Sequence, residues 1–331
     1  MPIKIVSRIQ FTLVLIALFA TSALACKVPV FRYALERWSA DKYEVLVIYH
    51  GSLDAASQRL VDKLKSPKLS ATANFEIQVV SADDLHEKRL VALWNNRTED
   101  AYPLMVVLYP RTAMEVPDRI LSVQPLTEPH IEQLLHSPVR AQLVQRLSGG
   151  QSAVWIFVPG GDKTKDAAAS KVLEERIAVN RERLTVPTAE ELEIEPSILA
   201  KNKIPLRIEF SVIKLDREDP REAFLLNSLS KSEADLEANQ PMAFPVFGRG
   251  RVLYALVGDG IMAETADTAC QFMAGPCSCQ VKNQNPGFDL LIDSDWEGAV
   301  AGSIISAAIP NEPEEPEEPR LLTIPPGRRN R

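Results

Sequence analysis

The sequence predicts an α/β fold of two successive units, each with a mixed central sheet flanked by helices. Two strongly apolar strands, at residues 43–49 (with Glu44 as its one charged residue) and 153–158, each lead into a glycine-containing turn and then a helix. After each of these helices the chain repeats the order strand, helix, proline-led strand, further strand, closing helix. Two repeats of one pattern support each other. A chain of 331 residues also exceeds the size of most single cores, so two domains are expected.

Apolar periodicity defines the elements of the first unit. Residues 28–38 start extended and then place aromatic side chains at helical spacing, which predicts a helix that docks on a sheet. After the central strand, Asp54 is a favoured N-cap residue for a helix that ends near residue 66. The remaining predicted elements are a half-buried strand at 75–79, a helix at 83–94, a strand at 102–109, a strand at 119–123 and a closing helix at 128–147.

The second unit follows a glycine-rich linker at 148–152. Its predicted elements are a strand at 153–158, a helix at 163–184, an acidic connector at 185–203, a strand at 208–212, a helix at 220–229, a hairpin at 244–258 and a helix at 261–274. The predicted organisation is therefore a leader at 1–25, units at 26–147 and 153–280, an extension at 281–310 with a helix at 299–309, and a tail at 311–331. The tail alternates proline and glutamate and is expected to be disordered, since it cannot bury enough apolar surface to fold.

Composition excludes one class of partner. Hydrophobic residues make up 46% of the chain and charged residues 24%, which is ordinary for a globular protein, and the formal net charge is -7. Nucleic acid needs a basic face to neutralise its phosphates. The acidic balance therefore argues against a nucleic-acid partner.

The N-terminus has the order of a secretory signal peptide. Lys4 and Arg8 precede an apolar core at 11–20, and an A-x-A cleavage site ends at residue 25. The apolar core is shorter than the roughly 20 residues of a membrane span. Cys26 follows the site directly, in a loose lipoprotein box that departs from the usual pattern at Ala23. We expect an exported protein that is periplasmic, or membrane-anchored if Cys26 is acylated.

The element order over residues 43–147 resembles the thioredoxin fold, and the second unit repeats it. This resemblance implies a cis-proline before the third strand, and Pro103 and Pro245 are the candidates. It also implies a redox cysteine pair where the central strand meets its helix. Residues 50–57 and 160–163 stand there and contain no cysteine. The sequence thus predicts two thioredoxin-like units in tandem that lack the CxxC motif and its disulfide chemistry.

Four cysteines remain after the leader: Cys26, Cys270, Cys277 and Cys279. In an oxidising compartment such a cluster favours a structural disulfide. We expect Cys270 to pair with Cys277 or Cys279, leaving the other to bond Cys26 unless that residue is acylated. Two alternatives use the same cysteines: a redox-active Cys277-Ser278-Cys279, whose small ring would be strained, and a metal site, which lacks the fourth ligand of a closed zinc site.

Other motifs carry weaker signals. Residues 160–164 resemble a phosphate-binding loop, but the spacing is wrong and Asp162 would repel phosphate, so a helix cap is the better interpretation. Residues 293–298 resemble half of a calcium loop, but Ile304 stands where the bidentate glutamate belongs. The four histidines are scattered, and Ser52 lies outside a nucleophile elbow. No catalytic set can be named.

The sequence therefore favours a non-catalytic binding or scaffold protein over an enzyme. The alternatives are a thiol-disulfide oxidoreductase and a metal-binding protein, both acting through the cysteine cluster. Residues 26–38 are similar to an uncharacterised family of exported bacterial proteins, which implies no activity. No cofactor is predicted. We expect a protein partner in the cell envelope, and contact with the membrane only through a lipid anchor at Cys26.

Overall fold

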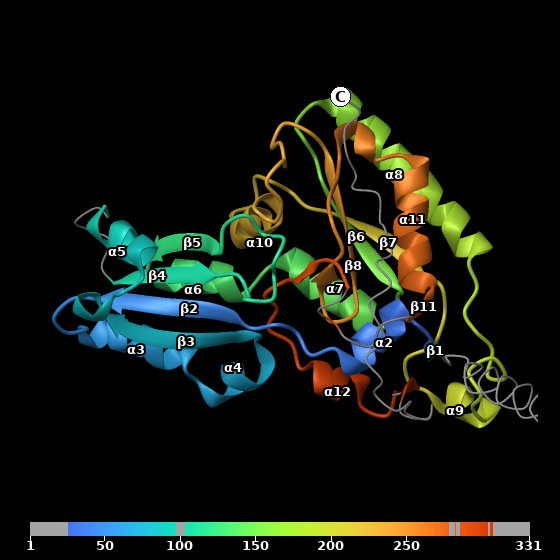
Figure 1. Cartoon of the computed structure of the whole chain (residues 1–331), viewed down its shortest axis with the longest axis horizontal. Coiled ribbons are helices and arrows are strands. Elements are labelled where there is room, and N and C mark those ends of the chain that lie inside the picture. The colour runs from blue at the N-terminus through green and yellow to red at the C-terminus, as the bar shows by residue number, and fades with distance from the viewer. Residues whose placement is uncertain (1–25, 97–102, 278–281, 283–284, 304, 307–331) are drawn as a thin grey trace, which may run out of the picture.

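The computed structural model describes residues 26–96, 103–277, 282, 285–303 and 305–306, and it contains two large mixed sheets flanked by helices. Figure 1 shows the two sheets side by side, with the sheet from the first half of the chain on the left. The predicted α/β class with mixed sheets is therefore confirmed. Within the described part of the chain, no helix is both long enough and apolar enough to cross a membrane.

The first sheet has the strand order β3-β2-β4-β5. Its central strand β2 (Tyr43–Tyr49) runs parallel to β3 (Phe75–Ser81) and antiparallel to β4 (Leu104–Leu108). β4 in turn pairs antiparallel with β5 (Ile120–Pro125). The apolar runs at residues 45–48 of β2 and Leu104–Leu108 of β4 explain the central positions of these strands, because a strand covered on both faces needs apolar side chains on both.

Helices cover both faces of this sheet. Leu46 and Ile48 of β2 and the even-numbered residues of β4 pack against Leu90 and Trp94 of α5 (Lys88–Asn95). The odd-numbered residues point to the opposite face, as the two-residue period of a strand requires. Four helices cover that face: α3 (Ala55–Leu64), α4 (Pro67–Thr72), α6 (Glu128–Leu135) and α7 (Pro138–Ser148).

The second sheet repeats the order and strand directions of the first. Its strands are β6 (Ala153–Val158), β7 (Phe210–Lys214), β8 (Met242–Phe247), β9 (Arg251–Val252), β10 (Leu256–Val257) and β12 (Phe288–Asp289). Along β7-β6-β8-β9, the first pair is parallel and the next two are antiparallel. β12 extends the edge beyond β9, and β10 also pairs with β8.

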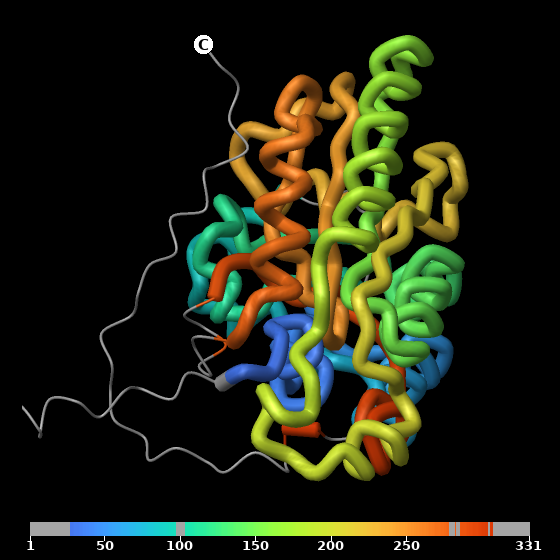
Figure 2. The backbone as a smooth tube through the Cα atoms, turned by 90° about the vertical axis from the view of Figure 1, so that its right-hand side faces the viewer, coloured from blue at the N-terminus to red at the C-terminus, as the bar shows by residue number. Residues whose placement is uncertain are grey.

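The two faces of the second sheet have different partners. Trp155 and Phe157 face α2 (Val30–Arg37), α8 (Lys163–Arg183) and α11 (Ala263–Ala274). Figure 2 shows α8 and α11 side by side on this face, with α2 below them. The alternate side chains of β6 enter the apolar core that also holds the odd-numbered residues of β2 and β4. The two units thus share one core, and α7 and α10 (Ala223–Ser230) lie at their junction.

Both ends of the described chain reinforce this arrangement. β1 (Cys26–Pro29) pairs with β11 (Pro276–Cys277) in a separate two-stranded sheet, and α2, which follows β1, packs on the second sheet. Residues 288–296, called here the C-terminal connection, run between the units. The Asn74 side chain holds this connection by donating to the carbonyl of Leu290 (3.0 Å) and accepting from the amide of Ile292 (2.7 Å).

Several predicted elements differ from the observed ones. The predicted helix at 128–147 is two helices, because Pro138 has no amide hydrogen and Ser137 caps α7 by accepting from Arg140 N at 3.0 Å. Where a helix was predicted at 299–309, the structure has α12 (Trp296–Val300), which Asp295 caps and which ends before residue 301; residues 304 and 307–309 lie outside the described part. The connector at 185–203 contains α9 (Pro196–Lys201), anchored by Leu192 and Ile194 in a small core.

Candidate functional site

The strand-to-helix junction of the first unit carries no cysteine. Gly51 adopts a positive φ of 71°, and the Asp54 carboxylate accepts a hydrogen bond from the amide of Ser57 at 2.7 Å. This bond lowers the pKa of Asp54, so the carboxylate is committed to capping α3. Ser52 is exposed in the turn. The junction is therefore a capped helix start, as the sequence predicts, and it contains no thiol.

The junction of the second unit explains why residues 160–164 are not a phosphate-binding loop. The amides of Gly160 and Gly161 donate to the carboxylate of Asp166 at 2.6 and 3.0 Å. The Asp162 carboxylate accepts from Thr164 N (2.9 Å) and Lys165 N (3.2 Å). The amides that would bind a phosphate already have carboxylate partners on the protein. A further anion would be repelled by them.

The prolines of the two units can be compared through strand register. Pro103 directly precedes β4, whose first residue pairs with Ile48, and its carbonyl accepts from Leu126 N at 2.7 Å. Pro241 directly precedes β8, whose first residue pairs with Val158, and its carbonyl accepts from Gly258 N at 2.8 Å. Pro241 is therefore the positional equivalent of Pro103 in the second unit.

Pro245, the residue proposed for this position, lies inside β8 opposite Trp155. Its carbonyl accepts from Leu253 N at 3.0 Å, in the gap between the short strands β9 and β10. A proline is tolerated in this central strand because its missing amide hydrogen faces that gap. The isomeric state of Phe244-Pro245 stays a prediction. The Tyr102-Pro103 bond begins at a residue outside the described part.

The cysteines do not form the predicted pair within the described residues. Cys270 lies in α11, buried against Trp155, and no disulfide joins it to Cys277. Burial, followed by the charge of Asp267, raises the pKa of the Cys270 thiol to about 12. Cys277 is 1% exposed in β11. Cys279 and the side chain of Cys26 lie outside the described residues.

Metal binding finds no support in the described part of the chain. No group of three or more histidine, cysteine, aspartate or glutamate side chains lies close enough there to hold an ion. Of the acidic residues in the calcium-like segment, Asp295 caps α12 by accepting from Gly298 N at 2.8 Å. Glu297 pairs with Arg249 at 2.5 Å. Both carboxylates therefore have partners within the fold.

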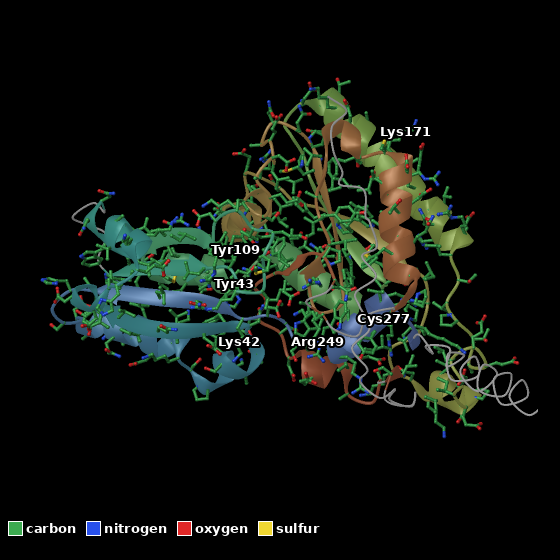
Figure 3. All side chains as sticks on the ribbon, viewed as in Figure 1. Lys42, Tyr43, Tyr109, Lys171, Arg249 and Cys277 are labelled. Carbon is green, nitrogen blue, oxygen red and sulfur yellow. The ribbon has the colours of Figure 1, made fainter. Side chains whose placement is uncertain are left out.

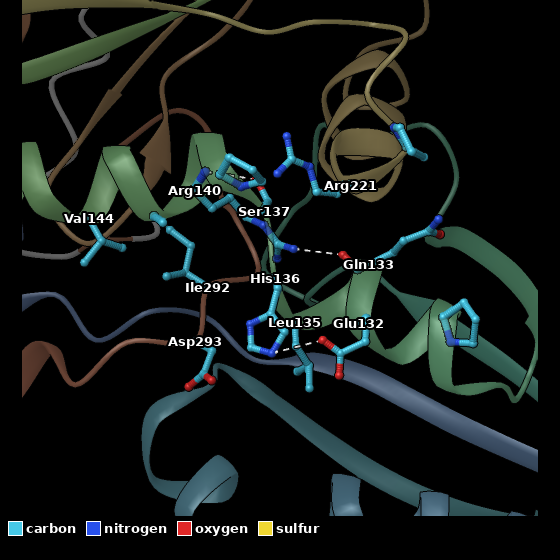
Figure 4. A pocket seen from close by; sticks show the side chains of 14 residues that line it. Glu132, Gln133, Leu135, His136, Ser137, Arg140, Val144, Arg221, Ile292 and Asp293 are labelled. Carbon is cyan, nitrogen blue, oxygen red and sulfur yellow. Dashed lines mark hydrogen bonds and ion pairs between the residues drawn. The ribbon is translucent and has the colours of Figure 1, made fainter.

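A cavity of about 780 Å³ lies at the junction of the two units and was not predicted from the sequence. We call it the inter-unit cleft (Figure 4). Helices α6 and α7 form one side, and the turn η2 (Pro220–Glu222) and the C-terminal connection contribute the rest. The lining residues are Pro129, Glu132, Gln133, Leu135, His136, Ser137, Pro138, Arg140, Ala141, Val144, Pro220, Arg221, Ile292 and Asp293.

Buried polar groups make part of this lining rigid. The Arg140 guanidinium donates to the carbonyls of Leu134 (2.9 Å) and Leu291 (2.6 Å), and it lies 5.5 Å from the centre of the Phe224 ring. Burial lowers the pKa of Arg140 to about 10, so the group stays charged at neutral pH. Beside it, Glu222 is 2% exposed and accepts from the Ser137 hydroxyl at 2.5 Å. These bonds join α6, α7, η2 and the C-terminal connection.

The rest of the lining consists of apolar residues and of polar or charged side chains. Three prolines and four aliphatic residues provide most of the apolar surface: Pro129, Pro138, Pro220, Leu135, Ala141, Val144 and Ile292. Exposed His136 lies 3.5 Å from the Glu132 carboxylate, and Arg221 pairs with Asp219 at 2.6 Å. In Figure 4 the guanidinium groups of Arg140 and Arg221 lie apart from the carboxylates of Glu132 and Asp293.

Ser137 and His136, which line the cleft, both contact carboxylates of the protein. Ser137 is 5% exposed, its hydroxyl donates to Glu222, and its oxygen accepts from the amide of Arg140, so the hydroxyl is engaged within the fold. His136 contacts only Glu132 among the cleft residues drawn in Figure 4. Comparison with known proteins does not assign the site, because no protein-family model matches the sequence and no curated protein is significantly similar to it.

Proposed function

We propose that the chain is an exported, non-catalytic binding or scaffold protein of the cell envelope, built from two degenerate thioredoxin-like units. The inter-unit cleft is its ligand site. The observation that carries this proposal is the cleft itself: its volume of about 780 Å³ is typical of ligand sites, and its lining is mainly apolar with a few placed charges.

The strand topology supports the thioredoxin-like part of the proposal. The paths β3-β2-β4-β5 and β7-β6-β8-β9 share one order, with a parallel first pair and an antiparallel third strand. Pro103 and Pro241 open the third strand of each unit. At the position of the missing cysteine pair, both units use an aspartate as helix cap instead, Asp54 and Asp162. Such units retain the scaffold and lose the disulfide chemistry.

The lining of the cleft supports a polypeptide ligand. Prolines and aliphatic side chains can accept an apolar side chain, while separated charges of both signs can pair with charges that flank it. Arg140 and Glu222 are locked by hydrogen bonds, so this part of the wall is preorganised. An extended segment of a protein partner, with an apolar residue between charged ones, has this chemistry.

Ala141 and Ala168 allow a matched test of the cleft. Ala141 is exposed on α7 and lines the cleft, whereas Ala168 is exposed on α8, away from it. We expect Ala141→Trp to weaken saturable binding of the apolar anion 1-anilinonaphthalene-8-sulfonate at least tenfold. Ala168→Trp should bind the dye like the wild type, and both variants should keep the wild-type melting temperature. Equal dye affinity in all three proteins would remove the cleft as the ligand site.

A photoreactive benzoylphenylalanine at the same two positions tests the partner in the native host. Crosslinking from position 141 to a discrete protein of the envelope fraction, absent from position 168, is the expected result. Export is tested in the same cells by fractionation and by the mass of the N-terminal peptide. A cytoplasmic chain that keeps Met1 as its major form would contradict export, whatever the cleft binds.

A further inference from the structure

The register of one short ladder identifies a partner for Cys26. Strands β1 and β11 are antiparallel, and the Cα atom of Cys26 is paired with the Cα atom of Cys277. The contact continues past the strands, because the amide of Val30 donates to the carbonyl of Gly275 at 2.9 Å. Figure 3 shows Cys277 beside α2, next to the segment that follows the mature N-terminus.

This placement fits the geometry of a disulfide. Residues directly opposite in an antiparallel ladder have Cα atoms about 4.5–5.5 Å apart. Disulfides join residues whose Cα atoms lie about 4.4–6.8 Å apart. The register therefore places Cys26 opposite Cys277, as a disulfide between them requires, although the short ladder is irregular between Cys26 and Pro29. Their separation along the chain means that the bond would connect the start of the mature protein to the segment after its last long helix.

The environment of Cys270 argues for the same connectivity. Cys270 is a thiol in the middle of α11, fully buried in the core with Trp155 and Leu253. Cys270 and Cys277 belong to the same buried cluster, yet no disulfide joins them. Cys277 is the cysteine that the ladder brings to the N-terminal strand.

We propose that Cys26 and Cys277 form a disulfide that staples the mature N-terminus to β11. The two thiols lose two protons and two electrons as the S–S bond forms. The acceptor is the disulfide of an envelope thiol oxidoreductase, which is released as a dithiol. The bond rests on the export part of the proposed function, since thiols persist in the cytoplasm. It also excludes acylation of Cys26, because a lipid thioether would occupy the same sulfur.

Peptide mapping of the mature protein tests this connectivity. The chain is secreted with its own leader, free thiols are blocked with iodoacetamide, and a chymotryptic digest is analysed without reduction. We expect a linked peptide that contains Cys26 and Cys277. It should persist in Cys270→Ser and Cys279→Ser and disappear in Cys277→Ser. A link from Cys26 to Cys279 in the wild type, or a diacylglycerol thioether on Cys26, would overturn the proposal.

Thermal unfolding gives a second readout. Cys26→Ser and Cys277→Ser should lower the melting temperature by the same several degrees, and the double variant should lose no more than either, since all three lack one bond. Additive losses would contradict a shared bond. If the protein keeps its leader in the cell, the proposal of export fails but the proposal of the disulfide does not. The purified chain is then oxidised with glutathione disulfide and mapped in the same way. Absence of the Cys26–Cys277 link after that oxidation would also refute the proposal.

Discussion

The phenol of Tyr43 in β2 donates a hydrogen bond of 2.7 Å to the backbone carbonyl of Asp289 in β12, and so joins the first sheet to the second. Tyr43 is fully buried, and burial raises the pKa of its hydroxyl, which keeps the donor protonated. Figure 3 shows Tyr43 and Tyr109 at this junction, where Tyr109 also packs against Phe288 at 5.8 Å between ring centres. The junction is thus specified by side chains from both halves.

Tyr43→Phe should destabilise the protein by about 1–2 kcal/mol, because it leaves the buried carbonyl of Asp289 without its donor. Tyr49→Phe is the matched control, since Tyr49 lies at the half-buried end of the same strand and its hydroxyl has no hydrogen bond within the described structure. Urea unfolding, monitored by tryptophan fluorescence, measures the stability of both variants. Equal stability of the two variants would show that the bond does not secure the junction.

Gly160→Ala should destabilise the second unit by about 3 kcal/mol through overpacking. A Cβ at this position would lie 2.5 Å from the carbonyl carbon of Gln240 and 2.7 Å from the nitrogen of Pro241, and neither backbone atom can move freely. Gly51→Ala, at the corresponding junction of the first unit, has open space and bears only the cost of its positive φ, about 1 kcal/mol.

Thermal denaturation of the two glycine variants distinguishes the causes. A greater loss in Gly160→Ala supports the close approach of the Gln240-Pro241 peptide to the junction. A greater loss in Gly51→Ala would mean that backbone conformation matters more than this contact.

Local patterns predicted the elements well, and arrangements between elements poorly. The apolar run of β6 ends where the sequence indicates, at Ala153 and Val158, and Asp162 caps the next helix as expected. The inter-unit cleft combines the α6–α7 pair with η2 and Asp293, which lie far along the sequence from it and share no motif with it. The one feature of the local sequence that bears on the cleft is Pro138, which interrupts a continuous helix over 128–147 and separates α6 from α7.

Strand register, that is, which residues of neighbouring strands face each other, could not be predicted from the sequence either. Composition shows that Cys26, Cys277 and Cys279 exist, but pairing depends on which backbone positions face each other. The same holds for the second proline. Sequence order makes Pro245 the counterpart of Pro103, yet the alignment of β8 with β6 gives that position to Pro241.

Glu233 should make stability depend on pH. Burial raises the pKa of its carboxyl, an effect that Asp235 and Glu115 strengthen and the hydrogen bond from Ala255 N (2.7 Å) opposes. Because the pKa is higher in the folded state than in the unfolded chain, the folded state holds the proton to higher pH. Its stabilising contribution is complete below the unfolded pKa and is lost as pH rises through the folded pKa.

Glu233→Gln should remove this loss, because the amide keeps the acceptor for Ala255 N and carries no charge. Unfolding free energies from pH 4 upward should therefore fall more steeply for the wild type than for Glu233→Gln. The exposed Glu182 on α8 provides the control, and Glu182→Gln should follow the wild type. Parallel curves for the wild type and Glu233→Gln would show that the carboxyl is not desolvated in the folded protein.

The purified protein should fail to reduce insulin disulfides with dithiothreitol as electron donor. Thioredoxin-type reduction needs an accessible thiolate with a lowered pKa, usually at a helix N-terminus. The strand-to-helix junctions contain no cysteine, and the pKa of Cys270 is raised to about 12 in the core. Cys277 is 1% exposed. The rate of insulin precipitation should therefore equal that of dithiothreitol alone, and the double variant Cys277→Ser/Cys279→Ser should give the same rate.

That variant also separates the structural role from the catalytic one. Its melting temperature should fall, because the staple between β1 and β11 is missing, while its far-ultraviolet circular dichroism stays native. Efficient insulin reduction by the wild type that disappears in this folded variant would instead assign the cysteine cluster to thiol-disulfide exchange. In that case the burial of Cys277 would have to be relieved during turnover, and the exposure of its thiol to iodoacetamide should rise when dithiothreitol is added.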